Sequence, residues 1–143
     1  LRKTQSFPVG LVAPTLHRGA DLQQEWGRVF ARAPRLPQAG IAAVGALREQ
    51  PAVLAAVAQA YARSVAWCRA YPMECGQMMH QHIDLLTPEA VADAVATSQL
   101  DAVPALAARG DLEFFFTQLM ARNAALVGGK LPEAGFYAAP ASA

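Results

Sequence analysis

The stretch PAVLAAVAQAYARSVAWCRAYPMEC, residues 51–75, decides how the middle of this chain folds. Pro51 suits the first position of a helix, where its missing N–H costs no hydrogen bond. Apolar side chains then recur at helical spacing, which predicts a helix over 51–71. Pro72 disfavours helical geometry at the residue before it, so we expect a break there and a second helix after it. The predicted apolar stripe consists of Val53, Leu54, Val57, Tyr61, Val65 and Cys68.

The break also gathers both cysteines, three of the four methionines and two of the three histidines. Cys75, Met79 and His82 are ligand types that suit Cu(I) or another soft metal. In an unbroken helix Cys68 and Cys75 would lie about 10 Å apart, beyond the reach of a disulfide. Only a break at Pro72 could fold the two cysteines together into disulfide range. As a third alternative, these soft side chains simply fill irregular core space, and all three alternatives stay open.

Further helices are predicted on both sides of this stretch. The residues at 21–33 begin with Asp21, a good N-cap, and prolines follow at their end. Thr87 and Pro88 have the N-cap and first-position types of another helix. A last helical region covers about 103–123, with three consecutive phenylalanines that one helix face cannot bury together.

Two apolar runs predict short strands. IAAVGAL, residues 41–47, is bounded by Gly40, and its length and β-branched content are typical of a buried strand. A second short strand is expected over 7–13, within a segment rich in Pro and Gly. The expected fold class is therefore α/β, mostly helical with one or two short strands.

Composition excludes several classes of function. A hydrophobic fraction of 54% with 16% charged residues indicates a globular domain with a core. The net charge of +1 and scattered Lys and Arg argue against nucleic acid. No apolar run approaches the roughly 18 residues of a membrane span. The chain has no phosphate-binding glycine loop and no HExxH, GxSxG or CxxC motif, so we expect no enzyme and no cofactor.

Four motifs in order carry a resemblance to a known family. They are DLQQEW, PRLPQAGIAAVGAL, QPAVLAAVAQAYARSVAWCRAYPMEC and GGKLPEAGFY, within residues 21–137. The order resembles the C-terminal part of ABC-transporter substrate-binding proteins of the nitrate/sulfonate/taurine type. The resemblance implies a periplasmic-binding-protein-like (type II) segment and a periplasmic, exported or lipid-anchored location. The chain starts with Leu1 rather than Met, so we expect a processed product or a piece of a longer protein.

The resemblance also implies how the segment is organised and what it does. Residues 1–40 would end the second lobe and form the hinge, 41–137 would supply the crossover strand and helices of the first lobe, and 138–143 would be a frayed tail. The lobes would close on a small anion or heterocycle and deliver it to an ABC permease. The N-terminal half of the same protein or a second copy would complete the fold. The hinge candidates are Leu36, Pro37 and Gly40, and Gln38 would offer its amide to the ligand.

A second hypothesis needs no ligand. The chain would be a small all-helical interaction module that dimerises through its alanine-rich helix and the face at 114–116. It predicts a folded homodimer that no small solute stabilises. A disulfide between Cys68 and Cys75 is compatible with export, which the family resemblance implies.

Overall fold

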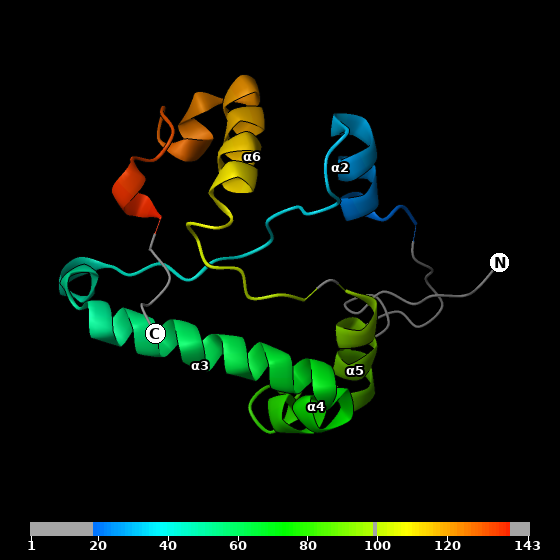
Figure 1. The fold of residues 1–143 in the computed structure, drawn as a ribbon. Helices are drawn as coiled ribbons and strands as arrows, with labels where there is room; N and C mark the ends of the chain where they lie inside the picture. The colour runs from blue at the N-terminus through cyan, green and yellow to red at the C-terminus, as the bar shows by residue number, and fades with distance from the viewer. Residues whose placement is uncertain (1–18, 99, 138–143) are drawn as a thin grey trace. The chain divides into compact units, whose positions relative to one another are not determined.

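The computed structural model describes residues 19–98 and 100–137 (Figure 1). This described part is helical, and none of its helices is long and apolar enough to cross a bilayer. Its α-helices are α2 (Leu22–Phe30), α3 (Pro51–Ala70), α4 (Pro72–His80), α5 (Pro88–Thr97) and α6 (Arg109–Arg122). Short 3₁₀ turns are η1 (Gly45–Glu49), η2 (Ala124–Val127) and η3 (Ala134–Phe136).

The expectation of an α/β, periplasmic-binding-protein-like fold is wrong, because the described residues contain no strand and no sheet. The run at 41–47 has no regular structure up to Val44 and then enters η1. Gly45 has a φ of 58°, which ends any extended course of the backbone. An extended apolar run needs a neighbouring strand to pair with, and the described residues offer none. The strand expected at 7–13 lies outside the described residues.

Contacts divide the chain into two compact units, and α3 crosses the boundary between them. The assignment of residues 1–40 and 41–137 to two lobes stays a prediction. The frayed tail predicted at 138–143 lies outside the described residues. The first unit contains 1–20 and 59–102, and the second contains 21–58 and 103–143.

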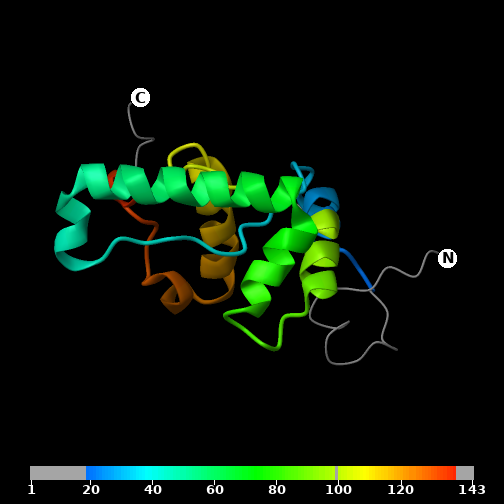
Figure 2. The ribbon, with the colours of Figure 1, turned by 90° about the horizontal axis from the view of Figure 1, so that it is seen from below.

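The first unit is built around the corner between α3 and α4. Tyr71 leaves helical geometry with φ −132° and ψ 68°, and Pro72 opens α4, as the sequence predicts. Figure 2 shows the sharp change of direction at this corner and α5 lying beside α4. The two helices approach closely at Gly76, where an added Cβ would lie 2.7 Å from the Cα of Pro88. Thr87 caps α5 by accepting a hydrogen bond from the Ala90 N–H, as predicted.

The second unit is held by aromatic rings. The side chain of Asp21 caps α2, as predicted, and α2 packs its rings against α6. The centroid of Trp26 lies 5.7 Å from that of Phe114 and 5.8 Å from that of Phe115. The ring of Phe116 instead meets Phe136, at 6.4 Å. All three consecutive phenylalanines therefore have ring partners inside this unit.

Candidate functional site

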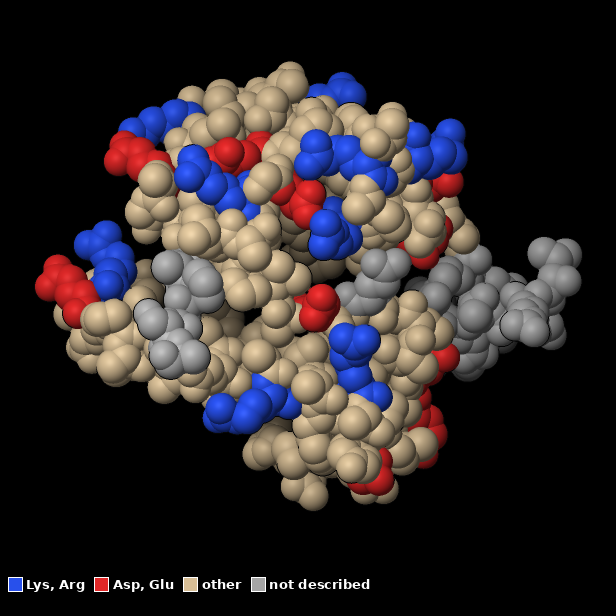
Figure 3. Space-filling model, in the orientation of Figure 1, with Lys and Arg blue, Asp and Glu red and all other residues tan. Residues whose placement is uncertain are grey.

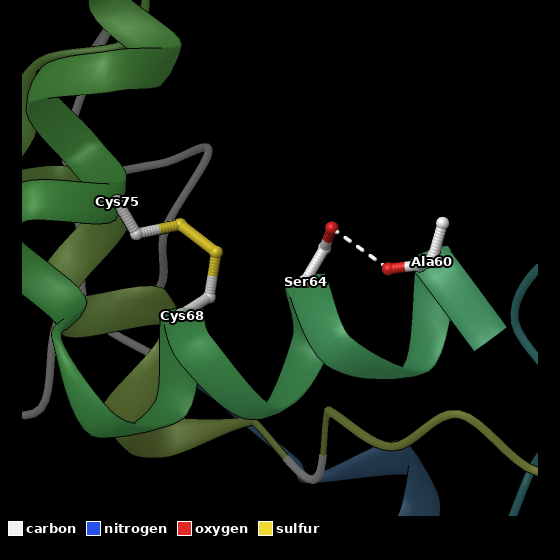
Figure 4. Close-up of a disulfide and its surroundings, with 4 residues drawn as sticks. All are labelled: Ala60, Ser64, Cys68 and Cys75. Atoms are coloured by element: carbon white, nitrogen blue, oxygen red, sulfur yellow. Dashed lines mark hydrogen bonds between the residues drawn. A yellow bond between two sulfur atoms is a disulfide. The ribbon is translucent and has the colours of Figure 1, made fainter.

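A disulfide spans the corner between α3 and α4 (Figure 4). It joins Cys68 to Cys75, whose Cα atoms lie 5.1 Å apart. The corner makes this possible, because the same spacing in a straight helix would separate them by about 10 Å. Tyr71 lies between the two helices and bonds to both: its N–H donates to the Trp67 carbonyl at 2.8 Å, and its carbonyl accepts from the Cys75 N–H at 2.9 Å. Of the three alternatives left open by the sequence, the structure contains the disulfide.

The residues of the metal hypothesis are not arranged as a ligand set. The sulfur of Cys75 is bonded to another sulfur and is 2% exposed as a residue, so it has no thiolate to offer. Met79 and His82 both lie exposed beyond it. In the described ranges, no group of three or more His, Cys, Asp or Glu side chains is placed to hold a metal ion.

Next to the corner, α3 and α4 form a shallow groove of about 360 Å³. Ala60, Ser64 and Trp67 repeat at helical spacing on one face of α3, and Met78 of α4 adds a flexible apolar side chain. The Ser64 hydroxyl donates to the Ala60 carbonyl at 3.0 Å, so it needs no further partner (Figure 4). The lining of the groove thus combines small side chains with larger apolar ones.

The groove has a cation in its lining. Among the described residues that line it, Arg63 is the only charged one. Its guanidinium has no ion pair or hydrogen bond to any other described residue. Along α3 the other charged residue is Arg69, and the helix contains no Asp or Glu. The groove therefore combines apolar walls with an uncompensated positive charge.

The apolar stripe of α3 is largely uncovered toward its N-terminus. Val53, Val57 and Tyr61 are 42%, 44% and 44% exposed. Among the residues of α3, all of which the structure describes, Val65 alone is buried. A helix this rich in apolar residues is normally covered on most sides by protein. The exposed stripe and the groove are the candidate functional surface.

The predicted hinge and ligand residues lie elsewhere. Leu36, Pro37 and Gly40 belong to an irregular stretch of the second unit, whereas the groove belongs to the first. The Leu36 N–H approaches the Gln23 side-chain oxygen at 3.5 Å. The side chain of Gln38 is exposed and makes no hydrogen bond within the described residues. The hinge and ligand roles of these residues stay predictions.

A cluster formed by Tyr137, Arg109 and Glu113 anchors the end of the described chain. Tyr137 is 4% exposed, and its hydroxyl has no hydrogen-bond partner among the described residues. The Arg109 guanidinium lies 5.1 Å from its ring centroid and also pairs with Glu113 at 2.7 Å. Burial raises the pKa of Tyr137, and the charge of Glu113 adds to this. A phenol held neutral in this way fits an anchor of the chain on α6 better than a reactive group.

No protein-family model, curated protein or solved structure matches the chain.

Figure 3 shows one face of the molecule, on which positive and negative side chains are interspersed. The sequence alone did not indicate the groove. The available signal was the placement of two small residues, Ala60 and Ser64, before Trp67 on a helix with no acidic residue.

Proposed function

We propose that this chain is a helical interaction segment, which acts by packing the exposed face of α3 against another polypeptide. The observation that carries the proposal is the exposure of Val53, Val57 and Tyr61 on a helix of apolar and small residues. When a partner covers the remaining surface of such half-exposed side chains, each of them stabilises the complex by about 1 kcal/mol. The groove continues this surface toward the corner with α4.

Of the two dimerisation faces expected from the sequence, one supports the proposal less well than the other. The face at 114–116, one of the two expected dimerisation faces, is engaged in ring contacts within its own unit. An interface there would have to displace rings that already cover each other. The alanine-rich helix, the other expected face, keeps its apolar stripe exposed.

A second candidate function is the solute-binding component of an ABC importer. The four ordered motifs favour it, and the last of them, GGKLPEAGFY, has a definite local structure. Gly128 and Gly129 have φ angles of 72° and 85°, which other residues adopt poorly, and Lys130 pairs with Glu133 at 3.0 Å. In this reading, the polypeptide that covers α3 belongs to the same exported transport protein, and a small anion or heterocycle is bound elsewhere in it.

Site-specific crosslinking tests the interaction proposal in the cell that makes the protein. A photoreactive residue replaces Val57 on the exposed stripe or, as the control, Ala62, which is exposed on the same helix about 140° around its axis from Val57. We expect one defined adduct from position 57 and none from position 62. Equal labelling at both positions, or none at either, would contradict the proposal.

The identity of the adduct separates the candidates. A permease subunit or a further segment of a solute-binding protein would support the importer, and an adduct of twice the chain's mass would indicate a homodimer. In parallel, thermal unfolding of the crosslinked assembly is followed with nitrate and with taurine. A rise in the unfolding temperature with either solute is expected for the importer and not for an interaction segment without a ligand.

A further inference from the structure

The groove on α3 and α4 also specifies the chemistry of its partner. We propose that it receives an amphipathic helix of a different polypeptide, whose apolar side chain enters the groove and whose carboxylate pairs with Arg63. This inference rests on the proposed interaction function and adds the class of partner to it.

The spacing and size of the lining side chains suit contact with a helix. Ala60, Ser64 and Trp67 follow the spacing at which one helix presents its surface to another. The small side chains at the first two positions let a partner backbone approach, and Trp67 and Met78 present apolar surface to an inserted side chain. The disulfide fixes Cys68, directly after Trp67, against α4, which carries Met78. The two helices that carry Trp67 and Met78 are thus linked before a partner arrives, which lowers the entropy cost of binding.

Charge selects an acidic partner over a second copy of α3. The α3 helix carries Arg63 and Arg69 and no acidic residue, so two copies packed along this face would bring together cations only. Like charges brought together at an interface disfavour association. Arg63 is exposed in the free chain. A carboxylate on the partner would instead neutralise its unpaired guanidinium, and the packed partner would exclude water from the pair and so strengthen the attraction.

The same two arginines argue against a lipid surface. Six residues apart on a helix, they point in directions about 120° from each other. A helix that lies in a membrane interface gathers its charges on one face and its apolar residues on the opposite face. Here one arginine lies beside the apolar groove itself.

The test uses the whole oxidised chain and two synthetic helical peptides. Both peptides carry leucines at positions i, i+3, i+4 and i+7, flanked by glutamates in one and by lysines in the other. Binding is measured by calorimetry. We expect the acidic peptide to bind at least about tenfold more tightly than the basic one, with an affinity that falls as salt increases.

Two pairs of variants locate the binding. Ala60→Trp fills the groove and should weaken the acidic peptide about tenfold or more, whereas Ala62→Trp, at an exposed site on the opposite side of α3, should leave it unchanged. Arg63→Glu should reverse the preference between the two peptides, and Arg69→Glu should not. Helix content by circular dichroism confirms that each variant is folded.

Four outcomes would overturn the proposal. They are an absence of binding by the acidic peptide, equal binding of both peptides, equal losses from the tryptophan variants at positions 60 and 62, and binding of the chain to phosphatidylglycerol vesicles in preference to the acidic peptide. Light scattering could also show that the chain is a dimer and that Ala60→Trp makes it a monomer. In that case the occupant of the groove is a second copy of the chain and not a helix of another polypeptide. If the peptide test fails but position 57 gives one defined crosslink, the interaction function is still supported. Only the proposal of an acidic partner helix is then contradicted.

Discussion

The first unit is held together by a covalent bond and a close backbone contact, whereas the second is held together by aromatic rings and ion pairs. In the first, the disulfide closes the corner of α3 and α4, and Gly76 lets α5 approach. In the second, α2 and α6 share a ring cluster, and Asp111 accepts from Arg32 at 3.2 Å and lies 3.6 Å from Arg35. A covalent brace needs little apolar burial, so the first unit can leave the groove on α3 and α4 uncovered for a partner.

The largest expected effect is the loss of Trp26 from the ring cluster. Its ring contacts Phe30, Phe114 and Phe115, with centroid distances of 4.5, 5.7 and 5.8 Å. Trp26→Ala should lower the free energy of unfolding by about 3 kcal/mol, because a large ring is removed and its partners lose contacts. Hydrogen exchange should show faster opening of α2 and α6, with α4 and α5 little changed. Val29→Ala, at a 61% exposed position of the same helix, is the control and should cost far less.

If Trp26→Ala opens α4 and α5 as much as α2 and α6, the two units do not unfold independently. The contrast between covalent and aromatic stabilisation would then describe local contacts and not separate folding units. That result would also weaken the argument that the first unit tolerates an uncovered groove on its own.

The next largest effect concerns the disulfide. Replacing both cysteines, Cys68→Ala with Cys75→Ala, should lower the free energy of unfolding by about 2–3 kcal/mol, because a short loop is no longer closed in the unfolded chain. Denaturation of the double variant should match that of the natural chain in dithiothreitol. Met73→Ala, within the same loop and 41% exposed, is the control. A natural chain that is equally stable with and without reductant would show that the corner is held by packing alone.

Peptide binding by the reduced chain tests whether the disulfide keeps the groove in shape. Without the disulfide, Trp67 and Met78 are no longer held at a fixed separation, so the acidic peptide should bind more weakly to the reduced chain. Unchanged peptide affinity after reduction would mean that the corner keeps the groove in shape without the covalent bond.

Alanine substitutions at two glycines should change the free energy of unfolding by smaller amounts and in opposite directions. Gly76 tests the contact between α4 and α5, and Gly110 is the control. Gly76→Ala should lower the free energy of unfolding by about 2 kcal/mol, because the new methyl group meets the backbone of Pro88. Gly110→Ala, at a helical glycine with nothing within 4 Å of the added atom, should raise it by up to about 1 kcal/mol. Thermal unfolding of both variants checks the pair. A stabilising Gly76→Ala would mean that α4 and α5 separate easily.

The elements that the sequence predicted correctly are those with local signals. Asp21 and Thr87 cap helices through hydrogen bonds to residues two or three positions away, and Pro72 acts on its immediate neighbour. The strand at 41–47 was predicted wrongly, because a strand depends on a distant partner and the described residues provide none. The disulfide stayed one alternative of three, because it depends on the angle of the corner, which no local pattern sets.

The smallest expected effect is at Tyr137, where the second unit buries a hydroxyl without a partner among the described residues. Tyr137→Phe removes that hydroxyl and keeps the ring beneath Arg109, so the free energy of unfolding at neutral pH should change by less than about 0.5 kcal/mol. Burial, and then Glu113, raise the pKa of Tyr137 above its ordinary value of 10.0, although Arg109 acts in the opposite direction.

The pH dependence follows from the direction of this shift. Because the folded state holds the phenol proton more tightly, its stabilising contribution is complete below pH 10 or so and is lost as the pH rises through the folded pKa. Denaturant titrations across the alkaline range should show a steeper loss of stability for the natural chain than for Tyr137→Phe. Identical alkaline profiles would mean that the hydroxyl reaches water or a hydrogen-bond partner in solution, and the anchor would then be a polar contact and not a buried ring.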